Sequence, residues 1–142
     1  MKKLLLICLA AFAAASCTQE KQQSKPLYMW FDCEANYATL SHPDSIRYYV
    51  SKIHDMGFTD VVVDVKSIMG ETLYKSDIAP YMGEWEGVTR PENYDLLGYF
   101  IEEGHKLGMR VHGSLNVFAG GHNYFDRGII YGDHADWQSQ VY

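Results

Sequence analysis

The stretch Phe58-Thr59-Asp60-Val61-Val62-Val63-Asp64-Val65-Lys66 decides the fold class. Its run of valines is typical of a strand that is buried within a parallel sheet. A helical pattern ending at Gly57 precedes it, and a second helical pattern leads from it to another apolar run at residues 109–116. Strands that are joined through helices lie parallel. We therefore predict that residues 61–66 form an inner strand of an α/β protein.

The rest of the chain repeats this unit. Residues 27–31 are continuously apolar and aromatic, which predicts a first buried strand. Helices are expected from Ser41 to Gly57 and from Asn93 to Gly108, each with a polar N-cap and a glycine end. The apolar stripe of the first helix comprises Ile46, Tyr49, Val50, Ile53 and Met56.

Short helix-to-strand loops and long strand-to-helix loops characterise this pattern. They predict a partial (β/α)8 TIM barrel consisting of the first three βα units with parallel strands. A doubly wound sheet is the alternative architecture. It is disfavoured because residues 32–36 lack the glycine-rich turn that cradles a diphosphate.

The composition excludes some functions. The net charge of −6 over 142 residues argues against a nucleic-acid-binding protein, which would show a basic patch, so no nucleic-acid partner is expected. The three cysteines are Cys8, Cys17 and Cys33, and the first two fall in a targeting segment. Cys33 is therefore expected to be a small buried residue rather than a nucleophile. No cofactor is predicted.

The first residues predict export. Met1-Lys2-Lys3 is basic, and the apolar run after it is too short to span a bilayer. Small residues ending at Cys17 resemble a bacterial lipoprotein signal over residues 1–17, with an ordinary secretory signal as the alternative. We expect Cys17 to be lipidated and to anchor the protein to a membrane of the bacterial cell envelope, in the periplasm or at the outer membrane. Residues 18–26 would be a flexible tether, and 27–142 the start of the barrel.

Side-chain alternation predicts which residues face the barrel mouth. Asp64 and Lys66 share one face of their strand, and His112 and Asn116 share one face of the next. Polar residues on the interior face are expected near the carboxyl ends of barrel strands, where active sites form. All four are therefore predicted to point into the mouth. Two alternatives remain: Asp64 and Lys66 form a plain ion pair, and His112 is a satisfied core histidine.

Two further groups complete the predicted site. Asp32 and Glu34 follow the first strand, and the long loop at residues 67–90 carries Tyr74, Tyr81 and Trp85, whose rings can stack on sugars. The alternative is that these rings pack the loop down. The predicted substrate-binding residues are Asp32, Asp64, Lys66, Tyr74, Trp85, His112 and Asn116. No catalytic pair is assigned.

The chain resembles the glycosyl hydrolase-like family-10 domain, most strongly in the second helix and third strand. The segments that carry the resemblance are residues 59–66, Leu73-Tyr74-Lys75-Ser76-Asp77-Ile78-Ala79-Pro80, Tyr94-Asp95-Leu96-Leu97, residues 100–112, Leu115-Asn116-Val117-Phe118, and Asp133-His134-Ala135-Asp136-Trp137. The resemblance covers about residues 28–140 and implies a secreted or lipid-anchored bacterial barrel that acts on polysaccharides. The chain departs from the family at Ser114, where an aromatic is usual, and at Lys66, where arginine is frequent.

The resemblance also implies that the catalytic carboxylates lie on later strands, outside these 142 residues. The expected function is therefore that of the N-terminal fragment of a glycoside hydrolase-like protein. A non-catalytic glycan-binding lipoprotein and an inactive truncated product are the alternatives. A metal site built from His112, His122, Asp126, Asp133 and His134 is disfavoured because their spacing is not that of a zinc site.

Overall fold

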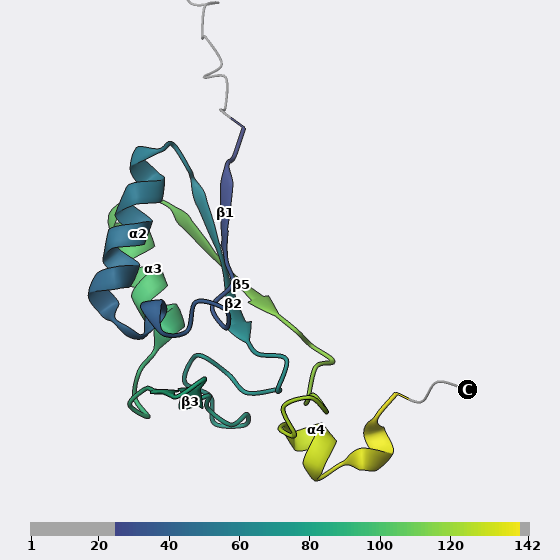
Figure 1. Cartoon of the computed structure of the whole chain (residues 1–142). Helices are drawn as coiled ribbons and strands as arrows, with labels where there is room; N and C mark the ends of the chain where they lie inside the picture. The colour runs from purple at the N-terminus through teal and green to yellow at the C-terminus, as the bar shows by residue number, and fades with distance from the viewer. Residues whose placement is uncertain (1–24, 140–142) are drawn as a thin grey trace, which may run out of the picture.

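A parallel three-stranded sheet forms the centre of the protein. The computed structural model describes residues 25–139. The sheet has the order β1-β2-β5, with β1 at Tyr28–Phe31, β2 at Asp60–Lys66 and β5 at Arg110–Leu115. Helices α2 (Pro43–Asp55) and α3 (Leu96–Lys106) connect the strands and cover one face of the sheet (Figure 1). This confirms the prediction of an α/β fold with parallel strands.

The core lies between the sheet and the two helices. Val61, Val63 and Val65 are buried on the helix side of β2, as the alternation predicts. Phe100 of α3 is fully buried against Phe31 of β1, with ring centroids 4.9 Å apart. The buried stripe of α2 is narrower than predicted. Ile46, Val50 and Ile53 are buried, whereas Tyr49 and Met56, which were predicted to belong to it, are exposed.

The helix ends follow the glycine prediction, but the N-caps do not. Gly57 and Gly108 adopt positive φ angles of 92° and 71°, as expected after a helix. Asp95, rather than Asn93, caps α3 by accepting a hydrogen bond from the backbone N–H of Gly98 at 3.0 Å. The expectation of an asparagine cap was therefore wrong by two residues.

Ser41 is not the cap of α2. It ends a short 3-10 helix, η1 (Thr39–Ser41), and its hydroxyl donates to the carbonyl of Tyr37 at 2.6 Å. The same hydroxyl accepts a hydrogen bond from Arg90 at 2.8 Å. Because both contacts occupy this group, His42 takes the cap position without a side-chain hydrogen bond.

The long loop between β2 and α3 contains a hairpin that the sequence did not predict. Strands β3 (Glu84–Trp85) and β4 (Val88–Thr89) pair in antiparallel fashion. The intervening Glu86 and Gly87 have φ angles of 48° and 80°, and positive values at both positions are typical of a tight hairpin turn. Arg90 fixes the hairpin to the core: it is buried, and its guanidinium lies 3.6 Å from the ring centroid of Tyr37.

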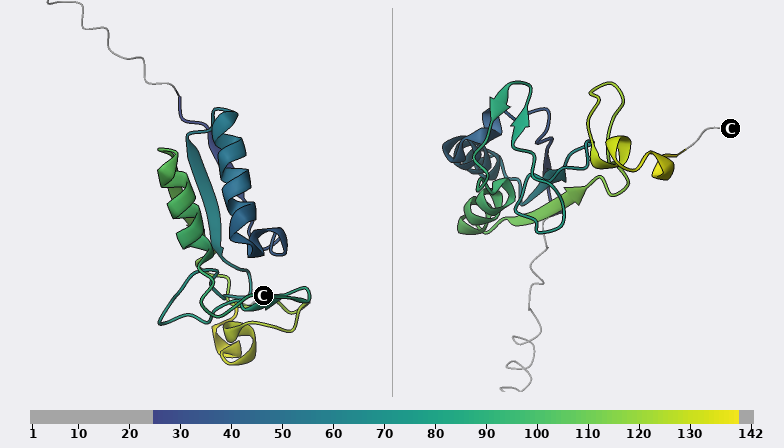
Figure 2. Two further views of the ribbon diagram at one scale, coloured as in Figure 1. Left: turned by 90° about the vertical axis from the view of Figure 1, so that its left-hand side faces the viewer. Right: turned by 90° about the horizontal axis from the view of Figure 1, so that it is seen from below.

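The segment after β5 folds beside this hairpin, beyond the carboxyl ends of the strands (Figure 1 and Figure 2, right). It carries two short helices, α4 (Ile129–Gly132) and η2 (Ala135–Trp137). Neither of these helices was predicted from the sequence. The carboxyl ends of the strands are consequently surrounded by loops, whereas the helices lie along their sides.

The second face of the sheet is not covered by a helix. Figure 2 shows both helices on the same side of the strands. Met29 and Phe31 of β1 pack against the core, but Tyr28 and Trp30 on the opposite face are exposed. The expectation that the whole apolar run is buried was therefore half right. On this open face, in the described part of the chain, the side chains meet solvent.

No helix among residues 25–139 is long and apolar enough to cross a membrane. The predicted signal at 1–17, its lipidated Cys17 and most of the tether at 18–26 lie outside the described residues.

Candidate functional site

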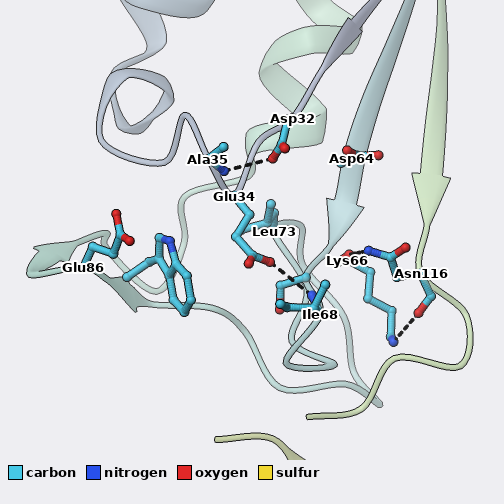
Figure 3. Close-up of a pocket in the computed structure, with 11 residues that line it drawn as sticks. Asp32, Glu34, Ala35, Asp64, Lys66, Ile68, Leu73, Glu86 and Asn116 are labelled. Carbon is cyan, nitrogen blue, oxygen red and sulfur yellow. Dashed lines mark hydrogen bonds between the residues drawn. The ribbon is translucent and has the colours of Figure 1, made fainter. Parts of the chain in front are cut away.

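A pocket opens where the three parallel strands end, and we call it the carboxyl-end pocket (Figure 3). Its volume is about 310 Å³, at the lower end of the range for small-molecule sites. The predicted residues that line it are Asp32, Asp64, Lys66, Trp85 and Asn116. The lining is completed by Glu34, Ala35, Ser67, Ile68, Leu73 and Glu86.

Three carboxylates at this pocket, two from the segment after β1 and one from β2, each accept a single N–H hydrogen bond from a described residue. Asp32 closes a turn by accepting from the backbone N–H of Ala35 at 2.9 Å. Glu34 accepts from the backbone N–H of Ile68 at 3.1 Å. Asp64 accepts from the indole N–H of Trp30 at 2.9 Å.

Among the residues that the structure describes, these carboxylates have no cation in direct contact. Within residues 25–139, Asp32, Glu34 and Asp64 form no salt bridge. Each therefore retains acceptor capacity for a bound molecule.

The surroundings of Glu34 shift the pKa of its carboxyl group. Burial raises the pKa of its carboxyl, and the nearby charge of Asp32 adds to the increase. The hydrogen bond from Ile68 acts in the opposite direction, since it favours the ionised form. Glu34 therefore keeps its proton to a higher pH than an exposed glutamate. The sequence indicated that Glu34 follows the first strand, but gave no signal of its burial.

Lys66 does not pair with Asp64, so the ion-pair interpretation was wrong. Its ammonium donates to the backbone carbonyl of Asn116 at 2.7 Å and to that of Ala119. Burial lowers the pKa of Lys66. This lysine therefore fixes the chain that leaves β5 against the end of β2. The side chain of Asn116 remains exposed at the pocket.

The predicted aromatic residues of the long loop between β2 and α3, Tyr74 and Trp85, pack against other side chains and offer little free ring surface to a ligand. Only 7% of Trp85 is exposed, and its ring packs against Phe125 with centroids 4.9 Å apart. Tyr74 is partly buried against the core and does not line the pocket. The alternative that these rings pack the loop is thus the better description of both residues.

His112 lies far from the pocket. It faces the predicted side of β5, but it pairs with Val62 in the first half of β2. Its Nε2 atom is 2.8 Å from a carboxylate oxygen of Asp60, the first residue of that strand. His112 and Asn116 are separated by four residues, or roughly 13 Å along an extended strand. The structure therefore does not bring His112 together with the other predicted residues.

The residues around Asp60 form what we call the amino-end cluster: Thr59, Asp60, Arg110 and His112. Arg110 contacts both carboxylate oxygens of Asp60, at 2.7 and 2.8 Å, and the Thr59 hydroxyl donates to one of them at 2.6 Å. These hydrogen bonds, led by those of Arg110, hold the pKa of Asp60 well below its usual range. This ion pair joins residues 50 positions apart, which the sequence pattern did not reveal.

Arg127 ties the loop after β5 to the wall of the pocket. Its guanidinium donates to both carboxylate oxygens of Glu71, at 2.9 and 2.6 Å, and to the carbonyl of Glu84 at 3.0 Å. The same cation lies 5.9 Å from the ring centroid of Trp85. Arg127 therefore holds the long loop, the hairpin and the loop after β5 together.

Glycines allow these loops to meet backbone to backbone. A Cβ atom on Gly70 would lie 3.0 Å from the Cα of Gly120, and one on Gly128 would lie 2.1 Å from the Cα of Gly121. The backbone N–H of Gly121 also donates to the carbonyl of Ile68 at 3.1 Å. Side chains at these positions would push the loops apart.

Neither a reactive thiol nor a metal-binding cluster is found among the described residues. Cys33 is fully buried as predicted, and burial raises the pKa of its thiol to about 12, which keeps it protonated and unreactive. Among the described residues, no three His, Cys, Asp or Glu side chains come together in a way that would hold a metal ion.

Comparisons with known proteins show a similarity to part of a much longer protein. An S-layer-related protein of Niallia circulans is 29% identical over 124 residues. The match covers 83% of this chain but only 8% of that protein, so the chain corresponds to a small part of its relative. No protein-family profile matches the sequence.

Proposed function

We propose that the carboxyl-end pocket binds carbohydrate, and that the chain supplies the first three βα units of a glycoside hydrolase-like (β/α)8 barrel. The observation that supports this proposal is a set of carboxylates at the carboxyl ends of β1 and β2, Asp32, Glu34 and Asp64, that form no salt bridge with any residue among 25–139. In a barrel of this type the site forms from the loops at that end. The strand order β1-β2-β5, with helices on one face, is the order in which such a barrel begins.

The pocket chemistry suits a polyhydroxylated ligand. Sugar hydroxyls can donate to Asp32 and Asp64 and can accept from the amide of Asn116. The partly buried pocket would strengthen these hydrogen bonds relative to those at an exposed surface. A basic, phosphate-binding alternative is disfavoured, because the one lysine in the lining is already occupied by backbone carbonyls.

Glu34 links this binding site to hydrolysis. Glycoside hydrolases use one carboxyl group as a proton donor and a second carboxylate as nucleophile or base. A raised pKa, as Glu34 has, is the property that a proton donor needs. In the proposed barrel, the direction of this pKa shift makes Glu34 the candidate proton donor, and the strands after β5 would supply further carboxylates.

The proposal includes a place in the cell. The relative in Niallia circulans is described as S-layer-related, which supports a cell-envelope location for this chain. The signal-like residues 1–17 support export, and Cys17 would carry the lipid anchor. In a membrane fractionation experiment, Cys17→Ala is expected to move the protein from the membrane to the soluble fraction. Retention in the membrane fraction would contradict the anchor.

Calorimetry with defined sugars tests the binding proposal. The 142-residue chain is titrated with cellohexaose and with chitohexaose, and then as Asn116→Ala. Loss of a ligand hydrogen bond worth about 1.4 kcal/mol would weaken the affinity about tenfold. Asn93→Ala is the matched control, since Asn93 is exposed and lies outside the pocket.

The outcomes separate three cases. Binding that weakens in Asn116→Ala but not in Asn93→Ala supports the pocket. Equal affinity in both variants places any binding elsewhere and contradicts it. The appearance of new reducing ends during incubation would indicate bond cleavage in addition to binding.

A further inference from the structure

Arg90 is a buried cation that has no counter-ion among residues 25–139. Only 3% of its surface is exposed, and its guanidinium forms no salt bridge with a described residue. Its Nη1 atom is buried and has no hydrogen-bond partner in this part of the chain. Taking a charge out of water is costly when no opposite charge compensates for it, and an apolar side chain of similar size is often tolerated equally well at such a place. Stability alone therefore does not account for an arginine at this position.

The guanidinium of Arg90 contacts the segment that follows β1. Its Nη2 atom donates to the carbonyl of Tyr37 at 2.9 Å, and its Nε atom donates to the hydroxyl of Ser41 at 2.8 Å. The guanidinium carbon also lies 3.6 Å from the ring centroid of Tyr37, so the cation stacks on this ring. A lysine has a single nitrogen at its end and cannot make these three contacts together. The planar fork of an arginine is what this arrangement requires.

Tyr37 connects Arg90 to both walls of the carboxyl-end pocket. Its backbone N–H donates to the carbonyl of Glu34 at 3.1 Å, which closes the turn on which Glu34 stands. Its hydroxyl donates to the carbonyl of Met82 at 2.8 Å, next to the hairpin of β3 and β4 that carries Glu86 at its turn. Glu34 and Glu86 both line the pocket and come from these two segments (Figure 3). Tyr37 thus joins the segment after β1 to the hairpin.

Arg90 makes the same connection in the opposite direction. It follows β4 of the hairpin, and its backbone N–H donates to the carbonyl of Gly83 at 2.8 Å. Its side chain reaches from there to Tyr37, whereas Tyr37 reaches back to Met82. Two links of opposite direction between the same two segments restrict how far these segments can separate. Because the described residues 25–139 already enclose Arg90, these contacts do not depend on later strands of a barrel.

We propose that Arg90 and Tyr37 form a positioning pair that sets the separation between Glu34 and the hairpin wall of the carboxyl-end pocket. The inference rests on the proposed function, because it concerns the placement of the candidate proton donor. Arg90 does not line the pocket and acts on Glu34 through Tyr37. Release of this pair lets the hairpin move away from Glu34 and admits water to its carboxyl group.

The titration of Glu34 tests this role without a ligand. In Arg90→Met, the pKa of Glu34, followed by ¹³C NMR of its carboxyl carbon, is expected to fall toward that of an exposed glutamate, because burial is the main cause that raises it. Loss of the positive charge of Arg90 would by itself raise this pKa. A fall therefore reports the change in geometry rather than the change in charge.

Three further variants refine the test. Arg90→Lys keeps the charge but loses the planar fork, so a fall similar to that of Arg90→Met is expected. Tyr37→Phe keeps the stacked ring but removes the hydroxyl of the second link, so a smaller fall is expected. Arg110→Met is the matched control. This arginine contacts Asp60 at the other end of the sheet, so its loss should lower the melting temperature and leave the pKa of Glu34 unchanged.

Circular dichroism shows whether each variant is folded, and Arg90→Lys and Tyr37→Phe carry the test if Arg90→Met does not fold. A lower pKa of Glu34 in the folded Arg90 variants, with no change in Arg110→Met, supports the positioning pair. An unchanged or higher pKa of Glu34 in Arg90→Lys and Tyr37→Phe overturns it.

These outcomes are distinct from those that bear on the proposed function. Absence of cellohexaose and chitohexaose binding by the unaltered chain contradicts the carbohydrate site, whatever the titration of Glu34 shows. Sugar binding that Asn116→Ala weakens, together with a Glu34 pKa that Arg90→Lys leaves unchanged, overturns the positioning pair alone.

Discussion

The carboxylates at the two ends of the sheet differ in their hydrogen-bond partners. At the amino end, Asp60 receives hydrogen bonds from Arg110, Thr59 and His112, so its charge is balanced within the fold. At the carboxyl end, Glu34 and Asp64 each accept a single N–H hydrogen bond and form no salt bridge with a described residue. Strand β2 contributes to both ends. The comparison indicates that the carboxylate at the amino end serves stability, whereas those at the carboxyl end keep free acceptor capacity, which is the basis of the proposed binding site.

The pKa shifts of Asp60 and Glu34 have opposite directions, so ionisation of these two groups has opposite effects on the free energy of folding. Arg110 and its neighbours lower the pKa of Asp60, so its ionised form stabilises the fold. Burial raises the pKa of Glu34, so its ionised form opposes folding. Groups that are held in such an unfavourable state occur frequently at functional sites.

The largest expected effect is at the amino end. Asp60→Asn removes the charge that Arg110 and His112 face, and we expect the melting temperature at pH 7 to fall by about 5 °C or more. Thermal unfolding followed by circular dichroism measures this. Asp44→Asn is the control. Asp44 pairs with Arg47 at an exposed site, so this substitution should change the melting temperature little.

The same variant has a predicted pH dependence. Because the pKa of Asp60 is lowered in the fold, its stabilisation is present above the ordinary aspartate pKa of about 4 and is lost as the pH falls further. The melting temperatures of the natural chain and Asp60→Asn should therefore converge below about pH 4. A gap that stays constant down to pH 2 would show that the charge is not responsible.

A smaller loss of stability is expected when Arg127, which joins the loops near the carboxyl-end pocket, is substituted. Arg127→Ala breaks the partly buried pair with Glu71 and should cost about 1 kcal/mol of unfolding free energy. Hydrogen exchange should rise at the amide of Gly121, which bonds the carbonyl of Ile68. Arg47→Ala removes an exposed arginine and serves as the comparison. Unchanged exchange at Gly121 would mean that the glycine contacts alone hold this loop.

The smallest effect on stability, with an opposite sign, is expected for Glu34→Gln. Since a raised carboxyl pKa penalises the ionised form, removing the charge should leave the melting temperature at pH 7 equal or slightly higher. The difference should vanish near pH 4, where the unfolded chain also begins to bind the proton. A clear loss of stability at pH 7 would place Glu34 with Asp60 among the structural carboxylates. Binding of cellohexaose should weaken in the same variant.

Local patterns predicted much of the fold from the sequence. The valine alternation placed Val61, Val63 and Val65 under the helices and Asp64 on the open face, as observed. Gly57 marked the end of α2 because a positive φ angle there is specific to few residues. These predictions depend on neighbouring residues alone.

The errors arose where distant residues decide the outcome. Alternation predicted which face of the sheet His112 lies on, but not its position along the sheet. That position depends on its pairing with Val62 of β2, and for this reason the prediction at the barrel mouth was wrong. Trp30 was assigned to the core because a continuous apolar run does not reveal that one face stays open. Asp64 and Lys66 each found another partner, Trp30 and the backbone carbonyl of Asn116. Such long-range pairings are absent from local periodicity.

The glycine contacts behind Ile68, which lines the carboxyl-end pocket, have a consequence for how the site can change over evolutionary time. Gly70 meets Gly120, and Gly121 meets Gly128, at separations that leave no room for a side chain. Mutations at these four positions would move the loop that carries Ile68, whereas a mutation of the exposed Asn116 would change a side chain of the pocket and leave the glycine contacts in place. The pocket lining can therefore vary at Asn116 while the loops behind it keep their packing.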